Sequence, residues 1–316
     1  MLNIFKIKDK AFYEVENKEY DQGCWFNLVT PTADELKYVS GITGVNLDFL
    51  KAALDDEELS RMELEEDALL LITNVPIMGD KHFFDTLPLG IILTPKHFIT
   101  VSLKENQVLS SFISFGKGFE EGKNTRFLLE ILFRSSKLYL KYLRYINRRT
   151  DELENDVKKT MKNQALYQLL DLEKSLVYFT TALKDNGIVL EKLLRLRKNN
   201  NYKHLLEMNE DDEDLLEDVI IENKQALEMV EMHSNILSGM MDAFASIISN
   251  NLNIVMKFLT TMTIVLTTPT MVASFFGMNV HVPWGQAKHG FWYVIVISAI
   301  LTSITVFTIF RKEKIR

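Results

Sequence analysis

The spacing of apolar residues changes along the chain and divides it into regions. In the first 120 residues, short apolar runs bounded by turn residues predict strands over Ala68–Val75, Leu89–Leu93 and His97–Leu103. Residues 32–54 open with Thr32 shortly before Asp34 and Glu35, which is typical of a capped helix start, and they predict one or two helices. We therefore expect an α/β domain over residues 1–122.

Beyond Lys123 the apolar residues recur at helical spacing. One long amphipathic helix is predicted from Phe127 through Tyr145 to Val157, and a second over Leu166–Leu196. The longest pattern alternates steps of four and three residues, as in a coiled-coil seam, and consists of Leu216, Ile220, Asn223, Leu227, Val230, Ser234, Leu237, Met241, Phe244, Ile248, Asn251 and Val255. Residues 123–257 are thus predicted to be a helical region and stalk.

Two runs without a charged residue follow, at Phe258–Phe276 and Phe291–Phe310. Each is long enough to cross a hydrocarbon core of ~30 Å as a helix. No proline occurs in the seam before Pro269, so a single helix of about sixty residues, ~90 Å long, is predicted to continue from the stalk into the first run. The fold class that we expect is an α+β membrane protein with an N-terminal cytoplasmic α/β domain, a long helical stalk and two C-terminal transmembrane helices.

The charges suggest how these spans are oriented. Residues 251–316 contain the single acid Glu313 and six bases, although the whole chain has a net charge of −7. The basic tail, residues 311–316 (RKEKIR), is expected to stay in the cytoplasm by the positive-inside rule. Both termini are then cytoplasmic and residues 277–290 form an outer loop. The acidic body argues against a nucleic-acid partner, and one cysteine, Cys24, excludes an intrachain disulfide.

The first span is unusually rich in threonine, and its polar residues are ordered. Asn253, Thr260, Thr267 and Ser274 follow one another at intervals of seven, so they lie along one face of a helix. Hydroxyls in a membrane helix often bond to their own backbone, and about half of those in the span are expected to do so. The face that remains is a candidate pore lining.

No catalytic apparatus is visible in the sequence. Phosphate-binding loops, nucleophile elbows and zinc-protease motifs are lacking, and the six histidines show no metal-ligand spacing in the body. His281 and His289 flank the predicted outer loop, where a passing cation would meet them. We therefore predict a protein that is not an enzyme.

The tripeptide Gly277, Met278, Asn279 closes the first span. With two C-terminal spans, a long stalk helix and a basic C-terminus, this arrangement resembles the CorA-type magnesium channels over essentially the full chain. The resemblance implies a homopentamer in a lipid bilayer, with the first span inside and the second outside. An oligomer is also required independently, because two helices cannot enclose a pore.

The resemblance also implies roles for single residues. Gly277, Met278 and Asn279 would form the selectivity filter, with Asn279 carboxamides as neutral acceptors for hydrated Mg²⁺. Asp242 and Asn253 fall at polar pore positions of the family, and their separation of eleven residues places them on one helix face. Asp218 falls at an acidic residue of a regulatory divalent-cation site, for which the partner acid is sought among Asp55, Asp56, Glu57 and Glu58.

Two positions depart from the family pattern. The loop after Asn279 contains no acid and contains Lys288, so electrostatic capture of cations at the pore mouth is not expected. Phe276 precedes the tripeptide where tyrosine is common in the family.

The function expected from this sequence is the influx of divalent cations, chiefly Mg²⁺, through the cell membrane, with Co²⁺ or Ni²⁺ as further substrates. Mg²⁺ is both the transported ion and a candidate regulatory ion. Two alternatives remain open: a zinc transporter of the related family branch, and a two-span coiled-coil receptor or scaffold.

Overall fold

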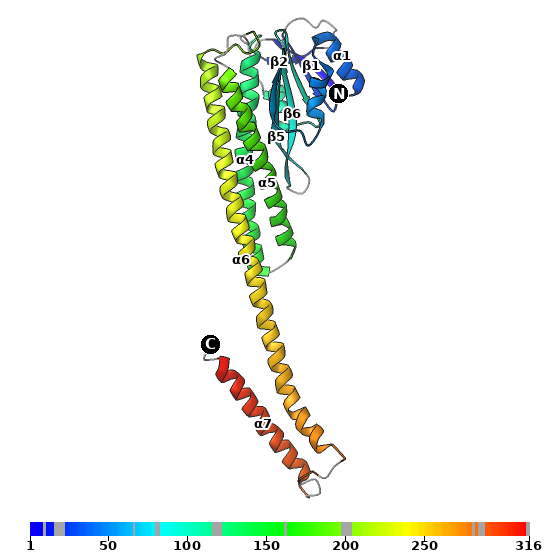
Figure 1. Cartoon of the computed structure of the whole chain (residues 1–316), viewed down its shortest axis with the longest axis vertical. Helices are drawn as coiled ribbons and strands as arrows, with labels where there is room; N and C mark the ends of the chain where they lie inside the picture. Colours follow the sequence, from blue (N-terminus) through cyan, green and yellow to red (C-terminus); the bar gives the residue numbers. More distant parts are fainter. Residues whose placement is uncertain are drawn as a thin grey trace. The chain divides into compact units, whose positions relative to one another are not determined.

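The computed structural model describes residues 1–8, 11–15, 23–65, 67–79, 83–115, 122–160, 163–196, 204–279, 282–283 and 288–313. The chain forms two compact units, residues 1–239 and residues 240–316. The helix α6 (Glu210–Phe276) contributes to both units, and α7 (Gly290–Glu313) belongs to the second. Figure 1 shows the elements of each unit.

The first unit is built on a seven-stranded sheet in the order β2-β1-β3-β7-β6-β5-β4. Only the β3–β7 pair is parallel among these neighbours. Every residue of β7 is buried, as are most of those in β5 and β6, which explains why these strands read as continuous apolar runs. The strands are β1 (Leu2–Lys8), β2 (Ala11–Glu14), β3 (Cys24–Val29), β4 (Arg61–Leu64), β5 (Leu69–Met78), β6 (Phe84–Leu93) and β7 (His97–Ser102).

Helices cover both faces of this sheet. One face packs against α1 (Ala33–Thr43), α2 (Leu47–Lys51) and the 3₁₀ turn η1 (Ala52–Leu54), in a core that contains Phe26 and Leu28. The other face packs against α3 (Gln107–Phe115), α4 (Asn124–Thr160), α5 (Asn163–Leu196) and the start of α6, in a core that contains Trp25 (Figure 1). Alternate residues of β3 thus enter opposite cores. The predicted fold class, an α/β domain followed by long helices and two apolar C-terminal helices, is confirmed.

The start of α1 agrees in detail with its sequence signal. The Thr32 hydroxyl accepts a hydrogen bond from the Glu35 backbone at 3.3 Å, and the Glu35 carboxylate accepts one from the Thr32 backbone at 2.8 Å. This is the reciprocal capping arrangement. It also lowers the pKa of Glu35, because the backbone N–H of Thr32 stabilises the charged carboxylate.

The predicted heptad seam of α6 agrees with the buried residues at every seventh position. At the positions in between, the buried residues differ from the predicted ones by one place. Leu216, Asn223, Val230 and Leu237 are buried in the first unit. Between these positions the sequence pattern places Ile220 and Leu227 in the seam. The fully buried residues are instead Val219 and Ala226, each one position earlier. The reason is that α6 packs against two helices, with ion pairs Lys137–Glu222 to α4 and Lys184–Glu231 to α5. Its apolar face is therefore wider than a two-stranded seam.

One buried carboxamide joins the helical layer to the sheet. The ladder between β4 and β5 stops at the pair Arg61–Ile72, two residues before Asn74. In place of the missing strand, the carboxamide oxygen of Asn186 in α5 accepts from the backbone N–H of Asn74, and its nitrogen donates to the Asn74 carbonyl, both at 2.9 Å. The Tyr139 hydroxyl of α4 donates to the same carbonyl at 2.9 Å. Two helices are thereby bonded to one strand residue.

The next residue, Gly187, lets α6 approach α5. A Cβ at this position would lie 3.4 Å from Nδ2 of Asn223. That nitrogen donates to the Leu183 carbonyl of α5 at 3.0 Å. The absence of a side chain at Gly187 therefore leaves room for a buried polar contact between the two helices.

We predict that Asn186→Ala lowers the free energy of unfolding by roughly 3 kcal/mol, because it removes two buried hydrogen bonds to the backbone of Asn74 and the acceptor of the Ser60 and Thr73 hydroxyls. For a unit of this size the unfolding temperature should fall by about 6–12 °C. Thermal unfolding of the purified protein in detergent, followed by circular dichroism, measures the change.

The matched control is Asn155→Ala. Asn155 is an exposed residue of α4 whose carboxamide donates to the Asp151 carbonyl at 2.9 Å. Its loss should cost less than about 0.5 kcal/mol. Equal unfolding temperatures in the two variants would show that the Asn186 carboxamide does not hold the layers together.

Candidate functional site

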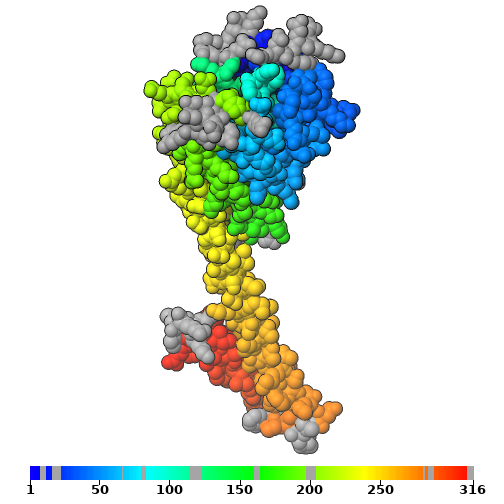
Figure 2. Space-filling model, turned by 45° about the horizontal axis from the view of Figure 1, so that its top comes forward, coloured from blue at the N-terminus to red at the C-terminus, as the bar shows by residue number. Residues whose placement is uncertain are grey.

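A long apolar stretch of α6 is not covered by any other part of the described chain. Every residue from Ala245 to Thr260 is exposed, on all sides of the helix. The stretch includes Leu252, Val255 and Phe258, which are 61%, 59% and 66% exposed. Figure 2 shows side chains of this orange segment at the surface. Water is a poor solvent for such a surface, so this part of α6 must contact lipid or other copies of the chain.

Two helices are long and apolar enough to cross a membrane, α6 and residues 290–311 of α7. In the apolar stretches that meet this criterion, 6% of the stretch in α6 is buried and none of the stretch in α7. The core helix of a soluble protein is mostly buried, so neither stretch has the burial of such a helix.

The hydroxyl groups of α6 fall into two sets. Four threonines donate to the carbonyl four residues earlier at 2.7–3.0 Å: Thr263, Thr267, Thr268 and Thr270. Thr260 and Ser274 make no such bond within the described part of the chain. Of the three predicted pore-lining hydroxyls, that of Thr267 is therefore used by the backbone, and those of Thr260 and Ser274 are not, within the described chain.

The residues predicted to line a pore share one sector of α6. At ~100° per residue, the five positions fall within a sector of about 60°. All five are exposed in the single chain. They are Asp242, Asn253, Thr260, Thr267 and Ser274. These residues form a polar stripe along the helix, and the other sides carry most of the large apolar side chains together with Asn250, Asn251 and Lys257.

The predicted filter residues lie where α6 ends. The helix stops at Phe276, and the backbone N–H of Gly277 still donates to the Ala273 carbonyl at 2.9 Å. A Cβ on Gly277 would lie 3.2 Å from that carbonyl oxygen, so a side chain here would crowd the helix end. Met278 and Asn279 are exposed. Val280, His281 and residues 284–287 of the predicted outer loop lie outside the described residues, as do residues 314–316 of the basic tail.

The acidic run at the start of α6 contains two kinds of carboxylate. Asp212 is buried and completes a capping box with Asn209: its carboxylate accepts from the Asn209 backbone at 3.3 Å, and the Asn209 carboxamide accepts from the Asp212 backbone at 2.8 Å. Asp212 also pairs with Arg126 of α4 at 3.4 Å. Asp218 is exposed, as are Asp214 and Glu217. Asp218 is therefore free to meet a cation or another chain, whereas Asp212 has a structural role.

Three of the four candidate partner acids border a cavity of about 740 Å³ in the first unit, and Asp55 does not line it. Asp56, Glu57 and Glu58 line it together with Asp85 and Asp185, two acids that sequence analysis did not single out because they come from β6 and α5. Burial raises the pKa of Asp185. Among the described residues, however, no three His, Cys, Asp or Glu side chains are close enough together to hold a metal ion.

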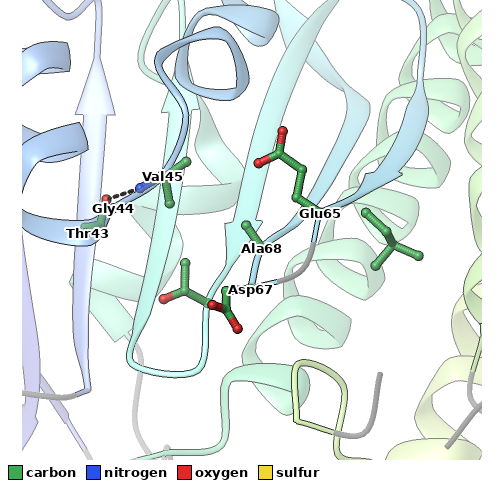
Figure 3. Close-up of a pocket in the computed structure, with 8 residues that line it drawn as sticks. Thr43, Gly44, Val45, Glu65, Asp67 and Ala68 are labelled. Carbon is green, nitrogen blue, oxygen red and sulfur yellow. Dashed lines mark hydrogen bonds between the residues drawn. The ribbon is translucent and has the colours of Figure 1, made fainter. Parts of the chain in front are cut away.

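Another cavity, of about 630 Å³, lies where α1 ends and β4 turns into β5. Figure 3 shows the Val45 backbone donating to the Thr43 hydroxyl at this helix end, at 3.4 Å. Glu65 and Asp67 line the cavity, and their carboxylates point away from one another (Figure 3). They therefore do not converge on an ion.

Known proteins resemble this chain over nearly its whole length. A model of the family described as CorA-like Mg2+ transporter protein matches residues 20–312. The cobalt/magnesium transport protein CorA of Methanocaldococcus jannaschii is 29% identical over 297 residues, which cover 92% of this chain and 90% of that protein. The protein of the same name from Thermotoga maritima is 24% identical over 298 residues, covering 92% and 82%.

Solved structures share the fold. The complete structure of the CorA magnesium transporter from Methanocaldococcus jannaschii superposes with a TM-score of 0.81 at 25% identity, covering 98% of this chain and 96% of that one. The full-length CmaX protein has the same fold, with a TM-score of 0.71 at 16% identity, and the coverage is again 98% and 96%. With the family model matching from residue 20 to residue 312, the chain belongs to the CorA-like Mg²⁺ transporter family.

Proposed function

We propose that copies of this chain form a ring in a membrane and conduct divalent cations, with Mg²⁺ as the main substrate. The observation that carries the proposal is the uncovered apolar stretch of α6 with its polar stripe. A ring of copies turns the stripes toward a common axis and leaves the apolar remainder for neighbouring helices and lipid. The relatives named cobalt/magnesium transport proteins support this class of substrate.

The arrangement that we propose is a homopentamer with α6 inside and α7 outside. Most of the hydroxyls of α7 are used within the helix, since Thr302, Ser303 and Thr305 donate to carbonyls four residues earlier at 2.7–2.9 Å. Such a surface suits lipid. The aromatic residues Phe291, Trp292 and Tyr293 at one end of α7 and Arg311 at the other suit the two interfaces of a bilayer. Both termini are then cytoplasmic, and the membrane is the cell membrane.

The filter in this proposal is a ring of Asn279 carboxamides and Gly277 carbonyls. Mg²⁺ holds its water shell tightly, so neutral acceptors that bond to the coordinated waters suit it better than a cage of carboxylates. Below the filter, Ser274, Thr267, Thr260 and Asn253 continue the row of neutral polar groups, and Asp242 adds a carboxylate near the cytoplasmic end.

The membrane potential supplies the driving force. A divalent ion that moves inward through 100 mV, inside negative, gains ~4.6 kcal/mol. The predicted spans, residues 258–276 and 291–310, contain no Asp or Glu. The proposed path therefore consists of uncharged groups inside the bilayer, and influx needs neither ATP nor a proton relay.

We also propose that cytoplasmic Mg²⁺ regulates the ring through Asp218. The side chain is exposed on α6, and Asp56, Glu57 and Glu58 line an acidic cavity in the first unit. A cation held between carboxylates of neighbouring copies would stabilise the closed ring, because its removal leaves like charges facing each other. Influx would thus limit itself.

We predict that Asn279→Ala abolishes Mg²⁺ flux and leaves assembly intact, because the carboxamide is the acceptor for the hydrated ion and is exposed at the helix end. Flux into liposomes loaded with a Mg²⁺ indicator measures the effect. Asn251→Ala is the matched control, since Asn251 lies 180° from Asp242 around α6, and should conduct normally. Normal flux in a correctly assembled Asn279→Ala protein would exclude this filter.

The same liposomes separate the alternative functions. With Mg²⁺, Co²⁺, Ni²⁺ and Zn²⁺ competing, we expect Mg²⁺ to be preferred. Preferred Zn²⁺ uptake would favour the zinc transporter, and the absence of flux for all four ions would favour a receptor or scaffold.

We predict five copies per particle and a pore lined by α6. Native mass spectrometry counts the copies. Cysteines introduced at Thr267 and Ser274 should react with small polar thiol reagents faster than cysteines at Ser298 and Thr305. The native Cys24 is fully buried and contributes little background. Faster reaction at Ser298 and Thr305 would identify α7 as the lining helix.

We predict that Asp218→Asn weakens the protection that Mg²⁺ gives against heat or protease. A ligand that binds only the closed state stabilises it by ~2.7 kcal/mol at a hundredfold excess over Kd. The variant should also conduct at internal Mg²⁺ concentrations that silence the wild type. The regulatory role would be excluded if protection by Mg²⁺ were unchanged in Asp218→Asn and in a variant that also carries Asp214→Asn and Glu217→Gln. The acidic run would then serve only to keep the protein soluble.

A further inference from the structure

A cavity of about 430 Å³ in the first unit contains polar groups that the ion path does not use. It lies between the ends of β1 and β3 and the first turns of α3. Its size is within the range of small-molecule sites. The lining includes the carboxamides of Asn3, Asn27 and Asn106 beside the apolar side chains of Phe5, Leu109 and Ile113.

A hydrogen-bond chain fixes the orientation of the Asn27 carboxamide. The indole N–H of Trp25 donates to the Thr100 hydroxyl at 2.8 Å. The proton of the Thr100 hydroxyl is therefore left to be donated to another acceptor, which is Asn27. The hydroxyl donates to Oδ1 of Asn27 at 2.9 Å. The amide nitrogen of Asn27 is therefore the end turned away from Thr100, and the described residues offer it no acceptor. The residue as a whole is only 4% exposed.

Asn106 presents a second amide donor at the cavity. Its Oδ1 accepts from the backbone N–H of Leu109 at 2.9 Å, which caps α3 and fixes the orientation of the amide. Its nitrogen is buried and has no hydrogen-bond partner in the described structure. Buried donors without acceptors are uncommon in folded proteins and call for an explanation. The one on Asn106 lines this cavity, beside the amide of Asn27.

The charges at the cavity disfavour an anionic ligand. Glu14 and Glu105 line it, and both are exposed at its rim. The positive group in the lining, the N-terminal ammonium of Met1, is paired with the Glu35 carboxylate at 3.0 Å. No Lys or Arg lines the cavity among the described residues. A phosphate or carboxylate would meet repulsion here, whereas a neutral carbonyl would not.

We propose that this cavity binds a small uncharged molecule with a carbonyl acceptor on a flat apolar frame, of which an aromatic carboxamide is the simplest case. The carbonyl accepts from the unpaired amide nitrogens of Asn27 and Asn106. The ring lies against Phe5, Leu109 and Ile113, and N–H groups of the ligand donate toward the rim carboxylates. The site is separate from the proposed ion path and does not depend on it.

Nicotinamide is the probe for this proposal, and nicotinate, which has the same ring and a carboxylate, is its matched counterpart. Binding to the full-length protein in detergent is measured by saturation-transfer NMR. For a ligand of this size we expect a Kd of ~1 mM for nicotinamide, and about tenfold weaker binding of nicotinate. Equal affinity for the two, or no saturation transfer to nicotinamide, would overturn the proposal.

Asn106→Asp tests the donor without removing the helix cap, because aspartate keeps the Oδ1 acceptor and caps helices as well as asparagine does. Nicotinamide should bind about tenfold more weakly to this variant, since one hydrogen bond is replaced by a repulsive contact. Asn46→Asp is the matched control: Asn46 caps α2 with a hydrogen bond from the Asp48 backbone at 3.0 Å and does not line the cavity.

A second variant tests the cavity itself. Ser110→Phe places a ring in the space that the ligand would occupy and should abolish nicotinamide binding while the unfolding temperature stays near that of the wild type. Unchanged binding in Ser110→Phe, or equal binding in Asn106→Asp and Asn46→Asp, would show that the probe binds elsewhere and would overturn the assignment.

Discussion

The surface of α6 over residues 245–260 has no cover within the described chain, and most of the molecule's organisation follows from this constraint. A stretch of helix without neighbours on any side gains nothing from intrachain packing, so the burial of its apolar side chains has to come from lipid or from further copies. The backbone imposes no obstacle, because a continuous helix satisfies its own hydrogen bonds in an apolar medium. The hydroxyls that bond to the preceding turn add no exposed polar groups to that surface.

The first unit differs, since it covers its apolar surface from within. Its sheet is buried on both faces, and the aromatic side chains of Trp25, Phe98 and Phe127 meet in the core on the helical side. The polar contacts within that layer, such as Asn186 with Asn74 and Asn223 with Leu183, connect specific positions of specific elements. They set the register between helices and sheet more precisely than apolar packing alone would.

Features that depend on neighbouring residues were predictable from the sequence. The two apolar runs, the capped start at Thr32, the three long helices and the tripeptide that begins at Gly277 are all local patterns. The approximate direction of the polar stripe on α6 was predictable as well, because a helix without a break relates Asp242 to Ser274 by arithmetic.

Features that depend on the tertiary fold could not be predicted from the sequence. The position of the seam between Leu216 and Leu237 required knowing that α6 packs against two helices. The meeting of Asp85 and Asp185 with residues 56–58 joins three distant segments. The role of Asn186 also escaped sequence analysis, since it depends on β4 beginning two residues too late to pair with Asn74. No local pattern marks any of these.

The sequence Asn186–Gly187 has a further consequence, for the chemical ageing of the protein. In a flexible chain, an asparagine followed by glycine is prone to deamidation, because the backbone nitrogen of the glycine can attack the carboxamide. Here the glycine makes room for Asn223, and the carboxamide is bonded to Asn74 within a helix. The attack requires that both the helix and these hydrogen bonds open. The rate at which aspartate accumulates at position 186 would therefore report how often this part of α5 separates from the sheet.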